Sequence, residues 1–183
     1  MGWRMKAAGA MAVMVGLGAC AAPDPFAVTS LPKGAQLDVR DMFAAHPGQT
    51  LCVDHQAADD SCASAITAEI TGDRMISREI GLVQLPEEGA AQRVEIMTRA
   101  MLQGGQACAG AQDITTPGRD EISGVLLEIT RDLVNQSGGT VCGSYYRSGE
   151  RYVLSPVGSN GTPFALGDSY VKFIDGPAKL RVQ

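Results

Sequence analysis

The sequence predicts an α+β fold, in which one small domain combines antiparallel strands with two to three helices and is cross-linked by disulfides. Three observations favour this class. Of the 183 residues, 45% are hydrophobic and 19% are charged, which is typical of one globular domain. Some stretches alternate apolar and polar residues, as strands do, and others repeat apolar residues at helical spacing. Four cysteines follow Cys20, and an even number in an exported chain is typical of two disulfides.

The first nineteen residues have the pattern of an export signal. Arg4 and Lys6 precede a stretch, 7–19, that contains only apolar or small residues. As a helix this stretch would be about 20 Å long, which is too short for a hydrocarbon core of about 30 Å. We therefore predict a signal peptide over 1–19 rather than a membrane-spanning helix.

The end of this stretch, Leu17-Gly18-Ala19-Cys20, resembles the lipobox of bacterial lipoproteins. The resemblance implies cleavage before Cys20, diacylglycerol on its thiol, and acylation of the new amine by a fatty acid such as palmitate. Two or three acyl chains form a stable membrane anchor. Ala21 is not the aspartate that retains enterobacterial lipoproteins in the inner membrane, so we expect an outer-membrane protein that faces the periplasm. The alternative is a plain secretory signal followed by a chance cysteine.

Segment 20–36 contains Pro23, Pro25 and Pro32 and predicts an extended tether that joins the lipid to a domain over 37–183. The mature chain would carry 13 basic and 20 acidic residues, a net charge of −7. Nucleic-acid binding relies on clustered cations and on stacking aromatics. The acidic balance and the aromatic content of 5% argue against a nucleic-acid partner.

The remaining cysteines are Cys52, Cys62, Cys108 and Cys142. Three pairings are possible. We favour Cys52–Cys62 and Cys108–Cys142, because the first two are close in sequence and could join neighbouring strands. A zinc site is the alternative, but the chain has no C-x-x-C pair, and its two histidines lie near only two of the cysteines.

The elements begin with a short helix that Asp38 caps. Strands are predicted over 50–55, 63–71 and 74–85. The clearest is 63–71, which alternates apolar and polar residues, and a turn at Gly72-Asp73 separates it from the strand that follows. A helix is predicted from Pro86, which two glutamates follow, to Gly104-Gly105. The apolar residues at helical spacing within it are Val94, Met97, Met101 and Leu102.

The strongest helical pattern follows, with Thr116 as the candidate cap, Pro117 in the first turn and Gly138-Gly139 at the end. Its apolar stripe consists of Ile122, Val125, Leu126, Ile129, Leu133 and Val134. The chain then predicts three more strands and two turns. The strands are expected over 140–146, 151–157 and 170–174, and the turns at Ser148-Gly149 and 159–161.

Two stretches resemble each other, 39–52 and 129–142. Each contains a helix end, a break with glycine and a cysteine that opens a predicted strand, and a weaker copy spans 97–108. One hypothesis is an internal duplication of a helix-plus-sheet unit. The alternative is that the signals that end helices and begin strands look alike in unrelated segments.

No set of residues converges on a catalytic motif, and we expect no cofactor and no metal. His46 follows the first helix, where an ordinary polar residue is expected. His55 lies near Asp54, Asp59 and Asp60, which could ligate a divalent cation. Their spacing is not that of a calcium loop, so a solvated acidic loop is favoured.

The densest cluster of tyrosines and arginines spans 145–152. Within it, Ser148, Gly149, Arg151 and Tyr152 form an S-G-x-R-Y pattern that resembles a loop of the periplasmic C-type lysozyme inhibitors. The resemblance implies an all-β barrel whose loop enters the lysozyme cleft. The alternative is a hairpin turn with tyrosine–arginine packing across the strands. The candidate interaction residues are Tyr145, Tyr146, Ser148, Arg151 and Tyr152.

Together these patterns predict a non-catalytic, membrane-anchored envelope lipoprotein that binds or supports another periplasmic or outer-membrane component. The partner is expected to be an envelope protein. Two alternatives stay open: an inhibitor of a lysozyme-like enzyme, and an enzyme of unknown class.

Overall fold

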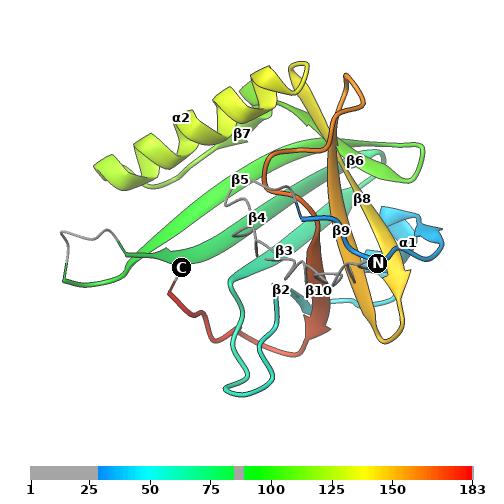
Figure 1. The fold of residues 1–183 in the computed structure, drawn as a ribbon, viewed down its shortest axis with the longest axis horizontal. Helices are drawn as coiled ribbons and strands as arrows, with labels where there is room; N and C mark the ends of the chain where they lie inside the picture. Colours follow the sequence, from blue (N-terminus) through cyan, green and yellow to red (C-terminus); the bar gives the residue numbers. More distant parts are fainter. Residues whose placement is uncertain (1–28, 85–88, 183) are drawn as a thin grey trace, which may run out of the picture.

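A computed structural model describes residues 29–84 and 89–182 of the chain (Figure 1). The predicted signal peptide, the lipidation site at Cys20 and the first part of the predicted tether lie outside these residues. Within the described ranges, no helix is long and apolar enough to cross a membrane.

An antiparallel β-barrel makes up most of the domain (Figure 1). Within the described residues, eight strands are paired in the order β8-β6-β5-β4-β3-β2-β10-β9, and the pairing of β9 with β8 closes the ring. Two short strands extend it, because β1 pairs with β8 and β7 with β5. The protein is therefore mostly β, with antiparallel strands as predicted but fewer helical residues than an α+β class implies.

The strands are β1 (Gln36–Leu37), β2 (Thr50–Val53), β3 (Ser64–Thr71), β4 (Arg74–Val83), β5 (Gln92–Gln103), β6 (Gln106–Gly110), β7 (Ile114–Thr115), β8 (Thr140–Ser148), β9 (Arg151–Gly158) and β10 (Ser169–Ile174). The helices are α1 (Val39–Ala44) and α2 (Glu121–Gln136), and a short 3-10 turn spans Ala111–Asp113. Six of the strands overlap those expected from the sequence, β1, β6 and β7 were not predicted, and β5 was predicted as part of a helix.

Helix α1 covers one end of the barrel, beside β8 (Figure 1). The Asp38 side chain accepts a hydrogen bond from the Arg40 N–H, which confirms the predicted cap. Val39 and Met42 are buried in the larger core cluster together with inward-facing residues of the strands. The helix is short, but burial of this apolar face stabilises its position.

Helix α2 begins later than predicted. Asp120 is its cap and accepts from the Ser123 N–H, whereas the Thr116 hydroxyl donates to the carbonyl of Glu95 on β5. The expected cap therefore ties the loop to the barrel and does not begin the helix. The helix ends before Gly138 and Gly139, as predicted, and both glycines have positive φ.

The apolar stripe of α2 is buried only in part. Ile122 and Val134 are buried, and Val134 packs with Ile114 and Phe164 in a second core cluster. Val125 and Ile129 are exposed. The helix consequently contacts the barrel along a narrower face than the sequence stripe indicates.

The helix predicted from Pro86 to Gly104 is wrong, because most of that stretch forms β5. β5 pairs with all ten residues of β4, and this ladder of long-range hydrogen bonds overrides a weak helical spacing. Ala100 on β5 faces the core, whereas Met101 pairs with the exposed Arg74 on the outer face. The weaker copy at 97–108 therefore lacks the helix end that the duplication hypothesis requires; for 39–52 and 129–142 the hypothesis stays a prediction.

Both predicted disulfides are confirmed. Cys52–Cys62 joins β2 to the segment before β3, and Cys108–Cys142 joins directly paired residues of β6 and β8. Each bond thus links neighbouring parts of the sheet. Such bonds stabilise a domain mainly because the loops they close reduce the conformational entropy of the unfolded chain.

The described part of the predicted tether lies against the domain. The Gly34 N–H donates to the carbonyl of Arg147 on β8 at 2.9 Å, and the Asp168 N–H donates to the Thr29 carbonyl at 2.8 Å. The Lys33 ammonium lies 2.9 Å from the Asp168 carboxylate. Residues 20–28 of the predicted tether lie outside the described residues.

Candidate functional site

The S-G-x-R-Y stretch forms the tip of the β8–β9 hairpin. Ser148 pairs with Arg151 as the last rung of the ladder, and Gly149 and Glu150 form the turn. Gly149 has a φ of 61°, a conformation that a residue with a Cβ adopts only at a cost. The turn thus lies one residue later than the predicted Ser148-Gly149, because Ser148 still pairs within β8, and the stretch is exposed at its tip.

The two neighbouring tyrosines of β8 point to opposite faces of the sheet, because successive side chains of a strand alternate between its faces. Tyr146 is half-buried, but Tyr145 is only 4% exposed and packs in the core cluster. Burial, and then the charge of Glu79, raise the pKa of the Tyr145 hydroxyl. Tyr145, predicted as an interaction residue, is therefore a core residue that cannot contact a partner directly.

Glu79 on β4 lies on the inward face, because it is paired with the core residue Ile66. Its carboxylate accepts a hydrogen bond from the buried Ser64 hydroxyl. Desolvation by the surrounding protein raises the pKa of the Glu79 carboxyl, although part of the side chain stays accessible. The inward face of β4 thus carries an acidic group, still open to solvent, that the sequence patterns did not reveal.

The outer face of the hairpin holds cations over aromatic rings. The Lys33 ammonium lies 5.6 Å from the centre of the Tyr146 ring, and the Arg151 guanidinium lies 5.4 Å from that of Tyr170. Each contact of this kind contributes about 0.5–1 kcal/mol at an exposed site. These side chains come from the segment before β1, from the hairpin and from β10. We name the residues Lys33, Tyr146, Ser148, Arg151 and Tyr170 the hairpin surface.

Asp168 holds Lys33 in this position. Its carboxylate accepts from the Leu31 N–H at 2.9 Å and lies 2.9 Å from the Lys33 ammonium, and it is only 9% exposed. Burial alone would raise the pKa of Asp168, but hydrogen bonds from Ser155 and Leu31 and the charge of Lys33 bring it below the ordinary value. The carboxylate is therefore ionised at neutral pH, and it orients the ammonium toward Tyr146.

Tyr152 faces the other side of the hairpin and contacts His46. The His46 Nε2 lies 3.0 Å from the Tyr152 hydroxyl, and the ring stacks on Phe173 with 4.0 Å between centroids. The His46 Nδ1 lies 2.8 Å from the Gln49 amide oxygen, while the Gln49 amide nitrogen donates to Asp175. Nδ1–H therefore donates to Gln49, and in the neutral ring Nε2 accepts from the tyrosine hydroxyl. His46 orients Tyr152, a role that its position after a helix does not predict.

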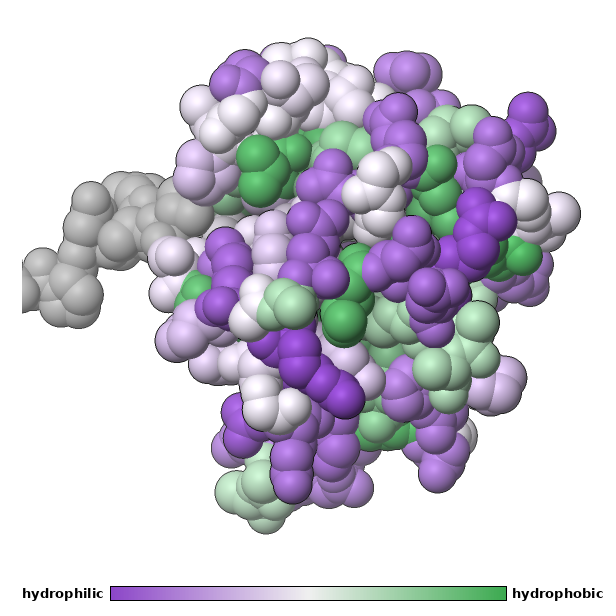
Figure 2. Space-filling model, turned by 90° about the vertical axis from the view of Figure 1, so that its right-hand side faces the viewer, coloured by the Kyte–Doolittle hydropathy of each residue, from purple (hydrophilic) through white to green (hydrophobic). Residues whose placement is uncertain are grey.

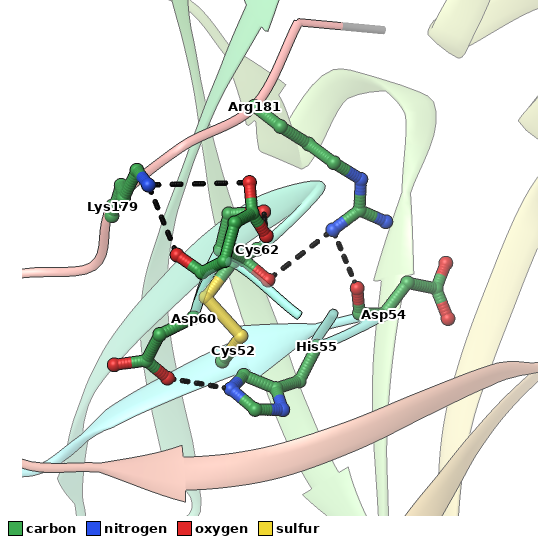
Figure 3. A network of polar contacts seen from close by, with 9 residues as sticks. Cys52, Asp54, His55, Asp60, Cys62, Lys179 and Arg181 are labelled. Carbon is green, nitrogen blue, oxygen red and sulfur yellow. Dashed lines mark hydrogen bonds and ion pairs between the residues drawn. A yellow bond between two sulfur atoms is a disulfide. The ribbon is translucent and has the colours of Figure 1, made fainter. Parts of the chain in front are cut away.

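The acidic loop near His55 is tied to the C-terminal segment (Figure 3). The His55 Nε2 lies 2.8 Å from an Asp60 carboxylate oxygen, and the Lys179 ammonium donates to the Asp59 carbonyl at 2.9 Å. The contact with His55 is the main cause that lowers the pKa of Asp60. Across the described ranges, no group of three or more His, Cys, Asp or Glu side chains is placed to hold a metal ion.

The same loop supports the hairpin surface. Arg181 donates to the Asp54 carbonyl at 2.6 Å (Figure 3). The Tyr170 N–H donates to the Asp54 carboxylate, and the Asp54 N–H donates to the Tyr170 carbonyl. Tyr170 is the ring that Arg151 covers. The loop therefore helps to position one aromatic residue of the hairpin surface.

Comparisons with protein-family models, with curated proteins and with solved structures found no match. The chemistry of the hairpin surface follows from its side chains. Tyrosine and arginine are enriched among residues that dominate binding energy at protein interfaces. Sequence reasoning identified Tyr146, Ser148 and Arg151, but it missed Lys33 and Tyr170, which only the folded chain brings to the hairpin.

Proposed function

We propose that the protein is a non-catalytic lipoprotein, anchored through Cys20 in the outer membrane and facing the periplasm, that binds another envelope protein through the hairpin surface. The observation that carries this proposal is the pair of cation–π contacts that hold Lys33 over Tyr146 and Arg151 over Tyr170. Side chains that are already ordered lose little conformational entropy when a partner binds.

Two further features support the envelope location. Both disulfides are typical of an oxidising compartment. The lipobox at 17–20 would supply the anchor, and residues 20–28 would span at most about 30 Å when fully extended. Because the chain is docked on the domain from Thr29 onward, first at Asp168 and then on β8 from Gly34, the hairpin surface would stay close to the membrane.

Photo-crosslinking in intact cells tests the binding role. A photoreactive amino acid at Tyr146 should form an adduct with one envelope protein, whereas the same group at the exposed Glu128 of α2 should not. A Cys20→Ser variant should leave the membrane fraction. Equal adducts at both positions would argue against the hairpin surface, and a variant that stays in the membrane would argue against the anchor.

A second candidate, inhibition of a C-type lysozyme, is favoured by the barrel itself. The stretch predicted as a long helix is β5, so the chain has the barrel architecture that the S-G-x-R-Y resemblance implies. Two carboxylates flank the bond that lysozyme cleaves. The exposed Arg151 near the hairpin tip has the charge to pair with them.

Muramidase activity measured with the purified chain tests this candidate. The chain should inhibit hydrolysis of a cell-wall substrate, and Arg151→Glu should weaken the inhibition at least tenfold, while Arg119→Glu near α2 should not. Unchanged lysozyme activity at high excess of the chain would remove this candidate and leave the first proposal standing.

A further inference from the structure

Arginines gather on the outer face of β4 and β5. The two strands are paired so that each arginine lies opposite an apolar residue, and paired residues project to the same side of a sheet. Met75 and Ala100, which alternate with these residues, are in the core, so the arginines face outward. The pairs are Arg74 with Met101, Ile76 with Arg99, Arg78 with Met97, and Leu82 with Arg93. We name these four arginines with Ile76, Met97 and Met101 the arginine face.

The charge of this face opposes that of the whole chain. Its four arginines are exposed, as are Ile76 at 43% and Met101 at 44%. On the same side of the three adjacent strands β3 to β5, the described carboxylates are Glu69 and Glu95, and Glu95 lies 2.9 Å from the Arg78 guanidinium. A basic patch with apolar residues on a chain of net charge −5 attracts an acidic partner.

One edge of the sheet next to this face has unpaired backbone. β2 pairs with β3 only at 64–66, so in the described chain Thr67 to Thr71 have β4 on one side and no strand on the other. The Ala63 N–H donates toward β2, and alternate residues of a strand direct their backbone groups the same way. Thr67 and Glu69 therefore present their N–H and C=O groups to the open side.

An open groove of about 830 Å³ runs beside this edge. Its walls come from α1 with the loop that follows and from β3, and Ile76, Arg78 and Met97 of the arginine face line it as well. Arg40 of α1 also lines it and has no ion pair with the described residues. Figure 2, which views the end that carries α1, shows apolar patches bordered by hydrophilic side chains.

We propose that this groove binds an extended, acidic segment of a partner protein, which adds as a strand to the free edge of β3. The backbone of the segment would pair with Thr67 and Glu69, and its aspartates or glutamates would reach Arg40 and Arg78. Strand addition of this kind takes affinity from main-chain hydrogen bonds and specificity from alternate side chains. The inference goes beyond the hairpin surface, because it assigns a second interaction site.

Two observations favour a peptide over an anionic membrane as the occupant. The site is a groove, whereas a bilayer surface would contact a flat or convex face. Unpaired N–H and C=O groups at a strand edge are satisfied by another strand and only indirectly by lipid headgroups. A membrane is therefore the competing occupant that the test must separate.

Fluorescence anisotropy with the full chain in detergent tests the proposal. The probe is a labelled synthetic peptide of about ten alternating glutamates and valines, and the matched control alternates lysine and valine. We expect saturable binding of the first peptide, and binding at least tenfold weaker for the second. A Glu-Val peptide that is N-methylated at alternate residues should also bind at least tenfold more weakly, because it cannot donate to the β3 edge.

Variants locate the site. The double substitution Arg40→Glu and Arg78→Glu should weaken binding of the Glu-Val peptide at least tenfold, and Arg119→Glu, an exposed arginine that does not line the groove, should leave it unchanged. Equal binding of both peptides, or no effect of N-methylation, would overturn strand addition. Binding to vesicles of phosphatidylglycerol and phosphatidylethanolamine that depends on the same arginines, without peptide binding, would also overturn it. Crosslinking at Tyr146 is independent, so either proposal can fail alone.

Discussion

The hairpin surface and the arginine face use similar residues in different ways. At the hairpin surface Lys33 contacts both Asp168 and Tyr146, and Arg151 covers Tyr170. On the arginine face, among the described contacts, only Arg78 has an ion pair. Cationic side chains that neighbouring groups hold in place offer a partner a defined shape. Cationic side chains without such contacts attract a partner mainly through their long-range electric field. The difference indicates a shape-specific contact at the hairpin and a salt-sensitive one at the groove.

The largest effect is expected from substituting the two neighbouring tyrosines of β8 one at a time. Tyr145→Ala removes a buried ring and should lower the free energy of unfolding by about 3–5 kcal/mol. Tyr146→Ala removes a half-buried ring and should cost less than about 1 kcal/mol, yet it should abolish the hairpin-specific crosslink when the photoreactive group is placed at Ser148. Urea unfolding measures both free energies. Similar losses for the two variants would contradict the assignment of Tyr145 to the core.

Next in size is the loss of the disulfide that joins β6 to β8. Replacing Cys108 and Cys142 by serine should lower the free energy of unfolding by about 4 kcal/mol, because the bond joins cysteines 34 residues apart. Replacing Cys52 and Cys62, which are 10 residues apart, should cost about 3 kcal/mol. Urea unfolding of both variants with and without reductant measures the difference. A larger loss for the shorter loop would contradict the loop-closure explanation.

A smaller effect concerns Asp168, which links Lys33 to the barrel. Asp168→Asn should lower the free energy of unfolding by about 1–3 kcal/mol at neutral pH, because it removes the charge that Lys33 and the Leu31 N–H contact. Glu128→Gln on the exposed face of α2 is the control and should cost less than about 0.5 kcal/mol. Equal effects of the two substitutions would contradict an anchoring role for Asp168.

Acid should have the same local effect as the Asp168 substitution. Because the pKa of Asp168 is lower in the folded protein than its ordinary value of 3.8, its contribution is complete above that value and is lost as pH falls through the folded pKa. Hydrogen exchange at the Leu31 amide, corrected for the intrinsic effect of pH, should therefore accelerate below about pH 4. No acceleration in the wild type, or the same pH profile in Asp168→Asn, would contradict this linkage.

Added salt should have the smallest effect on binding at the hairpin surface. Its effect on binding at the groove should be larger. Raising the ionic strength from about 0.05 to 0.5 M shortens the screening length from about 14 to 4 Å. The affinity of the Glu-Val peptide for the groove should fall severalfold, whereas the yield of the Tyr146 crosslink should change less than twofold. Equal salt dependence at the two sites would remove the contrast between held and free cations.

Local signals in the sequence predicted local features of this chain. The Asp38 cap, the Gly149 turn and the strand beside the Gly72 turn depend on residues within a few positions of one another. The pairing of the four cysteines also followed from their spacing. These features form wherever the local backbone and side chains favour them, so one sequence suffices to find them.

The tertiary structure alone decided the rest. Residues 92–103 have apolar residues at helical spacing, but they form β5 because β4 supplies a full ladder of hydrogen bonds. Lys33 meets Tyr146, and His46 meets Tyr152, only after the barrel closes. Such contacts join residues about a hundred positions apart, and their energy depends on geometry that no local pattern encodes. For this reason the sequence indicated the hairpin, and the fold determined which of its side chains face a partner.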